Sequence, residues 1–500
     1  MNGRARNLGA KTRAVFKVLY LAPLMAATLT LVACGGGGYS SMPAPPPKTP
    51  AAKSSMTVGA ITGFGVAAVN VNGKQFQTAG AAISVDGKAG QQGDLHAGDV
   101  VQIKGHHDAS SNEDVADEID FRGNVVGPVG AIDTTALTLV VLGQNVVVSA
   151  GTSFDDEISP ASLAGIHIGD VLEVSGMASA DGTIQATRIE RKPAGSTFQA
   201  SGTASATNAA AQTLNINALV VDFSAAMLSN FPSTGPQDGD LVEATGTVLE
   251  ASGALQATRL ELVNVAQEMQ PGNVDNAEVE GLITQFVSVT HFDVAGRPVT
   301  VTASTEFEGG AAGDLALNVH VEVEGSLDAA GVIEASKIRI AHPADARITA
   351  QVDSMDAAAA TVRLLGTEVS TDAMTRFEDH GSEQMTTFTL QDVQVGDWLE
   401  VRGTSAADGT SVVATRLDRL QPQSEVHLAG PVTAAAPPNL TILATPVATN
   451  GATQFSDGLD AGTFFDSLTG KVASVRGSWD GSTLSASAAQ LGDSDDGGDD

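Results

Sequence analysis

The stretch Gly169–Gly176 reads GDVLEVSG, and similar stretches recur along a chain of 500 residues. The final glycines of these copies follow one another at intervals of about 70 to 79 residues, which indicates tandem copies of a small domain. The other copies are GDVVQIKG (98–105), GDLVEATG (239–246), GDWLEVRG (396–403), and two weaker ones that end in HVEVEG at Gly325 and VASVRG at Gly477.

Each copy has the pattern of a β-strand preceded by a turn. Leu172 and Val174 alternate with Glu173 and Ser175, which is the period of a half-buried strand. The preceding Gly-Asp pair is typical of a turn, because Gly accepts positive φ and an Asp carboxylate accepts hydrogen bonds from nearby backbone N–H groups. We therefore interpret these aspartates as turn residues, and a catalytic or metal-binding role is the alternative.

Other landmarks accompany the motif. An Ala-Thr-Arg element follows about ten residues later in the clearest copies, at Ala186, Ala257 and Ala414. A Thr-x-Phe element precedes the motif in most copies. Hairpin turns are predicted where a glycine, in most cases after Asn or Asp, stands between two strand patterns. These predicted turns lie at Asn72-Gly73, near Gly143, at Asp181-Gly182, near Gly366, at Asp408-Gly409 and at Asp480-Gly481.

Each unit thus has about five strands in some 70 residues, which favours a small OB-like β-barrel. The predicted fold is all-β: a tandem array of about six OB-like barrel modules with separate small cores, after a signal peptide and a flexible tether. A unit of this size buries little surface alone, so some packing between neighbours is expected. The modules, called repeats 1 to 6 below, are predicted at 56–122, 123–192, 193–265, 275–342, 346–421 and 424–491, followed by an acidic tail at 492–500.

The N-terminal residues have the pattern of a secretory signal. Basic residues precede the apolar run Val18–Ala33, which is short for a membrane span. The run ends in LVAC, which resembles a bacterial lipobox, so residues 1–33 are predicted to be a signal peptide and Cys34 to carry lipid. By resemblance to the sorting signals of Gram-negative lipoproteins, Gly35 after the cysteine favours the outer membrane. Residues 34–55 lack apolar side chains for a core and are predicted to form a tether.

The composition argues against several classes of function. A formal charge of −32 repels phosphate backbones, so nucleic acid is not an expected partner. The sequence contains no G-x-S-x-G, H-E-x-x-H or P-loop pattern, and its single cysteine, Cys34, is assigned to the anchor. We therefore expect no catalytic residues, no cofactor and no metal site.

Two short stretches could nevertheless bind metal. His106, His107 and Asp108 offer imidazole and carboxylate ligands, but neighbouring residues on a strand point to opposite sides, so a solvated loop is favoured. The C-terminal aspartates lack the distal Glu of a calcium loop and are expected to be solvated. Trp398 and Trp479 are interpreted as core covers, rather than as stacking platforms for sugars or bases. The C-terminal aspartates are Asp493, Asp495, Asp496, Asp499 and Asp500.

The lipobox followed by tandem GD-x-V-E-V-x-G and A-T-R-I/L units resembles a family of bacterial lipoproteins built from a domain of unknown function, numbered five-six-six-six. The opening Ala60–Phe76, AITGFGVAAVNVNGKQF, resembles the start of its first unit. The resemblance covers about residues 56 to 491, with repeats 3 and 6 degenerate. It implies OB-like repeats and an envelope location, and it carries no activity.

The sequence leaves three functions open. The first is a lipid-anchored, non-enzymatic protein of the cell envelope that acts as a spacer or binds another envelope protein or a matrix polymer. The second is binding of a small ligand or a divalent cation by the β modules, which the many carboxylates suggest. The third is a hydrolase with an active site between modules.

Overall fold

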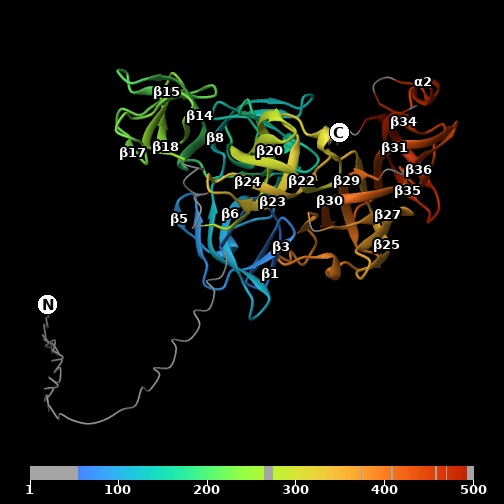
Figure 1. Ribbon diagram of the computed structural model, residues 1–500. Coiled ribbons are helices and arrows are strands. Elements are labelled where there is room, and N and C mark those ends of the chain that lie inside the picture. Colours follow the sequence, from blue (N-terminus) through green and yellow to red (C-terminus); the bar gives the residue numbers. More distant parts are fainter. Residues whose placement is uncertain are drawn as a thin grey trace, which may run out of the picture. The chain divides into compact units, whose positions relative to one another are not determined.

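The computed structural model describes residues 54–263 and 274–492, apart from 373, 407, 408, 457, 458 and 469 (Figure 1). The predicted signal peptide, Cys34, most of the tether, Asp408 and the tail aspartates lie outside the described residues. Strands dominate the described part of the chain, which confirms the all-β prediction. Within that part, no helix is long and apolar enough to cross a membrane.

The strands divide among the six repeats. Repeats 1 and 4 contain β1 (Ser54–Gly65), β2 (Ala68–Val71), β3 (Lys74–Gln77), β4 (Ala82–Val85), β5 (Lys88–Ala89), β6 (Val100–Asp108), β7 (Glu113–Phe121), and β20 (Asn276–Ser288), β21 (His291–Val294), β22 (Arg297–Glu308), β23 (His320–Leu327), β24 (Ile333–Ile340). Repeats 2 and 3 contain β8 (Val125–Asp133), β9 (Thr138–Val141), β10 (Gln144–Val147), β11 (Ser153–Phe154), β12 (Val171–Ala178), β13 (Ile184–Arg191), and β14 (Phe198–Asn208), β15 (Thr213–Ile216), β16 (Leu219–Asp222), β17 (Met227–Ser229), β18 (Leu241–Leu249), β19 (Leu255–Leu262).

Repeats 5 and 6 follow the same order of strands. They contain β25 (Ala346–Asp356), β26 (Thr361–Leu364), β27 (Thr367–Ser370), β28 (Arg376–Asp379), β29 (Trp398–Ser405), β30 (Ser411–Leu420), and β31 (Val426–Ala436), β32 (Asn439–Ile442), β33 (Thr445–Ala448), β34 (Gln454–Phe455), β35 (Val472–Trp479), β36 (Leu484–Leu491). The helical segments of the described residues are short: η1 (Gln92–Asp94), η2 (Leu163–Gly165), η3 (Ala312–Asp314), η4 (Leu390–Asp392) and α2 (Ala461–Asp466).

Within a repeat, the strand pairings return to the strand where they began. In repeat 2, β8 pairs with β9, β9 with β10, and β10 in parallel with β13. Strand β13 pairs with the motif strand β12, which pairs in turn with β8. Each such circuit is one coil of the chain, with β12 and β13 as its central hairpin.

The last glycine of the repeated motif is required by a close approach of two backbones. A Cβ built on Gly176 would lie 2.3 Å from the carbonyl oxygen of Gln185 on the neighbouring strand. The strand register shifts at this point, as it does in a β-bulge. The equivalent glycines of the other five repeats show the same overlap, at 2.0–2.3 Å, and the same shift. Only glycine fits, which explains why this residue is repeated six times.

The turn chemistry that the sequence predicts is confirmed. The Gly-Asp glycines Gly98, Gly169, Gly239 and Gly396 all have a φ of 93°. The following aspartates accept a backbone N–H three residues earlier, as Asp170 does from His167 at 2.9 Å. The Thr-x-Phe threonines also have one role, because each donates to the carbonyl of the alanine in the Ala-Thr-Arg element or its equivalent. These bonds are Thr152 to Ala186, Thr305 to Ala335, Thr375 to Ala414 and Thr453 to Ala486, at 2.7–2.8 Å.

The predicted separation into six OB-like barrels is wrong. The repeats join in pairs through their first strands. Each pair forms one continuous sheet of twelve strands, so the described residues contain three such sheets. Strands β8 and β14 pair antiparallel, as do β25 and β31, whereas β1 and β20 pair in parallel. Repeat 1 therefore joins repeat 4, although two other repeats separate them in the sequence (Figure 1).

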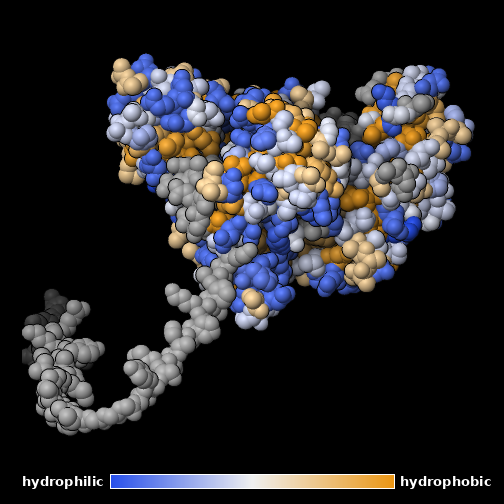
Figure 2. Space-filling view, in the orientation of Figure 1, coloured by the Kyte–Doolittle hydropathy of each residue, from blue (hydrophilic) through white to orange (hydrophobic). Residues whose placement is uncertain are grey.

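The hydrophobic cores follow these pairs in two of the three sheets. One cluster combines repeats 2 and 3, and another combines repeats 5 and 6. Repeat 1 keeps a cluster of its own around Ile103 and Ile119, and only Met56 and Val58 join the cluster of repeat 4. A lone coil would leave the edge of its first strand open and much apolar surface exposed, and pairing with another coil removes both costs. The architecture is thus a β-solenoid of stacked coils rather than a row of independent barrels. On the face in Figure 2, hydrophilic and hydrophobic residues are interspersed.

Candidate functional site

In repeats 2 and 3 the glutamate of the motif strand is buried, contrary to the half-exposed pattern in the sequence. Glu173 and Ser175 are each 2% exposed, and Glu243 is 6% exposed. Other repeats supply their surroundings, because Asp86 of repeat 1 lies near both Glu173 and Glu243. Stacking of the coils therefore encloses side chains that a single coil would leave in water.

Each buried motif glutamate has a basic partner. Lys192 pairs with Glu173, Arg122 reaches Glu243 at 3.4 Å, and Arg339 pairs with Glu322. Arg347 donates to Glu400 at 2.7 Å. Burial still raises the pKa of the Glu173 carboxyl to about 8, with Asp86 adding to the effect against Lys192. At Glu400 burial also opposes ionisation, but Arg402 and Arg347 hold its pKa well below the ordinary range.

Repeats 2 and 5 meet at a buried cluster of charges centred on Glu378, called the junction below. Its carboxylate lies 3.9 Å from Arg188 and 3.8 Å from Arg416, and the Ser153 hydroxyl donates to it. Burial opposes ionisation, yet Arg416, His380 and Arg188 together hold the pKa of Glu378 well below its usual range. Ion pairs of this kind are costly to break, because removal of one partner leaves the other charged and buried.

Backbone carbonyls complete the junction. Arg376 donates to the carbonyls of Gly151 and Thr187 at 2.8 and 3.0 Å, and Arg416 donates to the carbonyl of Thr152 at 2.6 Å. Each bond runs from repeat 5 to repeat 2. Two arginines thus bind backbone that lies more than a hundred residues away in the sequence.

A third repeat enters the junction through His96, Ala97, Gly98 and Asp99 of repeat 1. The Nδ1 atom of His96 lies 2.7 Å from Glu190 Oε1, and Asp99 lies close to both. These three residues could surround a metal ion, and they could not be found from the sequence because they come from two repeats. Arg188 Nε, however, donates to the same Glu190 oxygen at 2.6 Å. A positive charge thus already occupies the position a cation would take, so the cluster fits an ion-pair contact better than a metal site.

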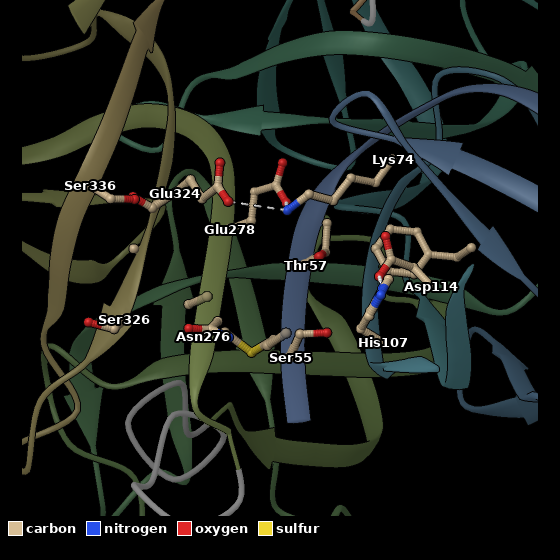
Figure 3. A pocket seen from close by; sticks show the side chains of 14 residues that line it. Ser55, Thr57, Lys74, His107, Asp114, Asn276, Glu278, Glu324, Ser326 and Ser336 are labelled. Carbon is tan, nitrogen blue, oxygen red and sulfur yellow. Dashed lines mark hydrogen bonds and ion pairs between the residues drawn. The ribbon is translucent and has the colours of Figure 1, made fainter. Parts of the chain in front are cut away.

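A groove with a cavity of about 420 Å³ lies over the seam between repeats 1 and 4 (Figure 3). The parallel strands β1 and β20 contribute Ser55–Thr57 and Asn276–Glu278 to its lining. Lys74 Nζ lies 2.5 Å from Glu278 and 3.5 Å from Glu324, between the two carboxylates. Burial lowers the pKa of Lys74, but Glu278 and Glu324 outweigh it and raise that pKa above the ordinary value.

The opposite wall of the groove contains one of the predicted candidate residues. His107 lies 3.0 Å from Asp114 and lines the groove, whereas His106 pairs with Asp117 at 2.9 Å. The prediction that these neighbours point apart is confirmed, but they lie in β6 and not in a loop, because β6 continues to Asp108 in its pairing with β7. With three carboxylates, one lysine and one histidine, the groove favours a polar, positively charged ligand.

Trp398 and Trp479 pack against the shared core of repeats 5 and 6, as partly buried residues. Their interpretation as core covers is confirmed. The motif aspartates act in turns, as described above. Asp99 also enters the junction. Burial there raises the pKa of the Asp99 carboxyl to about 7, although the positive charge of Arg188 opposes this rise.

The junction predicts a large effect of Glu378→Gln on stability. The substitution leaves Arg188 and Arg416 buried beside a neutral amide, so we expect the free energy of unfolding to fall by about 3–5 kcal/mol. Urea denaturation followed by circular dichroism measures this loss. Glu368→Gln in the same repeat is the control, because its ion pair with Arg363 is exposed and should contribute less than about 1 kcal/mol. Equal, small losses in both variants would contradict the role of the junction.

The junction also predicts a pH dependence through His380, which lies 3.4 Å from Glu378 and 2.9 Å from Asp156. The hydrogen bond to Glu378 raises the pKa of His380 to about 9 against the opposing effect of burial. Its stabilisation is therefore complete below the ordinary histidine pKa of about 6.5 and is lost as the pH rises through about 9. We expect His380→Gln to cost more stability near about pH 6 than near about pH 9.5.

Urea midpoints at the two pH values measure this difference, with the exposed His291→Gln as the control. The same loss at both pH values in His380→Gln would show that the imidazole does not act through its charge.

Among curated proteins, none matches this chain. Among solved structures, "drosophila Unr CSD456" is similar over 43% of this chain and 99% of its own, at 10% identity and a TM-score of 0.14, which supports no conclusion. A family model described as "Domain of unknown function (DUF5666)" matches residues 58–120, 126–190, 280–339, 349–418 and 429–488. Repeat 3 falls outside these spans, whereas repeat 6 is matched. Since the five matches cover more than half of the sequence, the chain belongs to the DUF5666 family.

Proposed function

We propose that this chain is a non-enzymatic lipoprotein of the cell envelope, whose stacked repeats form a stiff spacer and binding surface on a lipid anchor. The observation that carries the proposal is the junction. Buried charged groups of repeats 2 and 5 meet there across a contact between coils, since Arg188 faces Glu378 and Arg416 donates to the Thr152 carbonyl. These charged groups hold the coils together, and each one is already neutralised by a partner of opposite charge within the junction.

Stiffness follows from this arrangement. Three continuous sheets and the contacts of repeats 1, 2 and 5 at one junction restrict bending between coils. Separate domains on flexible linkers would bend at every domain boundary. Here the paired repeats share a continuous sheet, and repeats 2 and 3 and repeats 5 and 6 also share a hydrophobic core. A stack of this kind suits a protein that presents a surface at a fixed distance from its attachment point.

The anchor and the partner are the remaining elements of the proposal. The lipobox-like LVAC supports attachment of a lipid at Cys34, and the tether proposed at residues 34–55 would link it to the repeats. A charge of −32 disfavours nucleic acid and suits an envelope protein or matrix polymer with basic or neutral groups.

Replacement of Cys34 tests the anchor. We expect the wild-type chain in the membrane fraction, with a mature N-terminal peptide that begins at a lipid-modified Cys34 in mass spectra. Cys34→Ala should leave the membrane fraction, because the thiol that carries the lipid is gone. Ser41→Ala, in the same tether, is the control and should stay with the membrane. A membrane-bound chain that still begins at Met1 with an unmodified thiol would contradict the proposal.

The groove supports a second candidate function, the binding of a small polar cation. Its carboxylates Glu278 and Glu324 converge on one ammonium group, that of Lys74 (Figure 3). A ligand with an amino group or a divalent cation could use the more exposed carboxylates, Glu324 and Asp114, while Lys74 keeps Glu278. The hydroxyl groups of Ser326 and Ser336 lie on the same wall as Glu324.

Calorimetric titration with calcium chloride and with a short diamine tests the groove. Binding by the wild-type chain should weaken several-fold in Glu324→Gln, because the ligand loses a charge partner that is half exposed. Glu118→Gln is the matched control, since Glu118 is equally exposed in its pair with Lys104 and does not line the groove. No heat with either probe at millimolar concentration would remove this candidate.

A further inference from the structure

One contact inside the chain joins a Gly-Asp turn to an Ala-Thr-Arg strand. The turn of repeat 1, His96–Asp99, lies on β13 of repeat 2. The Thr187 hydroxyl donates to the Gly98 carbonyl at 2.6 Å, and Arg188 donates to the Ala97 carbonyl at 3.2 Å. His96 contacts Glu190 at 2.7 Å, and the N–H of Val100 donates to the Ser175 hydroxyl at 2.8 Å.

The fit depends on the glycine of the turn. A Cβ on Gly98 would lie 2.8 Å from the Thr187 carbonyl oxygen, so a larger residue would push the turn off the strand. The contact thus needs a turn with the sequence His-x-Gly-Asp and a strand with the sequence Thr-Arg-x-Glu.

The same two sequences occur a second time, and both copies are accessible. His167–Asp170 of repeat 2 reads His-Ile-Gly-Asp, and Gly169 has the same φ of 93° as Gly98. The side chain of His167 is 78% exposed, and Ile168 is 72% exposed. Apart from Gly169 and its two chain neighbours, no atom of the described residues lies within 4 Å of a Cβ built on Gly169, so the space that the strand fills at Gly98 is open here.

The second strand is Thr258–Glu261 of repeat 3, which reads Thr-Arg-Leu-Glu. Thr258 is exposed, and the side chain of Arg259 is 43% exposed. Thr245 takes the place of Ser175 on the neighbouring motif strand, since it pairs with Arg259 as Ser175 pairs with Arg188.

The charges around the second strand also match those of the first. Arg259 donates to Glu261 at 2.6 Å, as Arg188 does to Glu190. Arg122 lies within 3.5 Å of Glu261 and of Glu243. Lys192 makes the equivalent two contacts in repeat 2. Among the described residues the buried Nε of Arg259 has no hydrogen-bond partner.

One difference separates the two strands. The side-chain amide of Asn230 donates to Glu261 Oε1 at 3.1 Å, at an exposed position, whereas His96 contacts the equivalent oxygen in the docked strand. A docked imidazole would replace this amide.

We propose that the His167–Asp170 turn of one copy of this chain docks on the Thr258–Glu261 strand of a second copy. The docked turn would repeat the contact between repeats 1 and 2, with Ile168 where Ala97 lies. Ala97 is buried in that contact, so docking would also cover the exposed Ile168. His167 offers a basic group to Glu261, and the Gly169 carbonyl accepts from Thr258. This inference does not depend on the proposed function.

The turn and the strand are different surfaces, so the association is heterologous. Each copy offers one turn and one strand, and successive copies would join head to tail into short filaments. Stacking of coils would thereby continue from one chain to the next.

Sedimentation velocity over a concentration series tests the proposal on the full chain with Cys34→Ser, which removes the lipid-bearing thiol. We expect association that increases with concentration and that is roughly tenfold or more weaker in Ile168→Asp and in Glu261→Gln. Val395→Asp is the matched control, because Val395 is 66% exposed at the same position of the repeat 5 turn, which lacks the histidine. It should associate like the parent chain.

A second measurement locates the contact. Copies with Ile168→Cys are mixed with copies with Thr258→Cys, both on the Cys34→Ser chain, and disulfide-linked dimers are counted under mild oxidation. The mixture should yield heterodimers in excess over a mixture of Val395→Cys and Thr258→Cys. A chain that stays monomeric at all concentrations, or association that Ile168→Asp leaves unchanged, would overturn the proposal. The substituted residues Ile168 and Thr258 are exposed, so loss of the fold does not explain either result.

Discussion

The close approach of two strands at the motif glycine is the constraint on which the rest of the structure depends. At Gly176 and its five equivalents a carbonyl oxygen occupies the space of a Cβ atom, and the strand register shifts there. The bulge increases the local twist and re-aims the side chains of the central hairpin. On the strands that face the bulges, Arg188 of repeat 2 and Arg416 of repeat 5 lie in the junction. The Thr152 hydroxyl donates a hydrogen bond to the carbonyl of Ala186 on the same strand as Arg188.

The seams between coils combine two kinds of interaction. First strands pair with one another, which satisfies backbone groups that an isolated coil would expose to water. Buried ion pairs then fix which coil meets which, as Arg416 does when it binds the carbonyl of Thr152. Buried pairs add little net stability compared with apolar contacts, but a wrong pairing of coils would leave their charges without partners. The polar contacts thus select the arrangement that the sheets and cores stabilise.

Local features could be predicted from the sequence, whereas the contacts between repeats could not. The repeated motif, the strands and the Gly-Asp turns follow from short-range rules, and Asp170 and Gly169 obey them. Glu173 misled the prediction, because alternation with Leu172 and Val174 is typical of a strand with one face in water. Its burial depends on other repeats, and no period within the motif records them. For the same reason the junction and the His96–Glu190 contact were not visible in the sequence.

The parallel pairing of β1 with β20 has a consequence for how the chain is made. Glu280 accepts a hydrogen bond from the N–H of Ala60 across 220 residues, so the first strand has to wait for much of the chain. At about 5–20 residues per second, ribosomes need roughly 10–40 s to supply that stretch. During this delay an open strand edge is exposed to other nascent chains. Repeats 2 and 3, which need only each other for their sheet, can fold meanwhile. The seam between repeats 1 and 4 can therefore close only after repeats 2 and 3 and the first strand of repeat 4 have been synthesised, although β1 can pair with β2 and β6 of its own repeat before then.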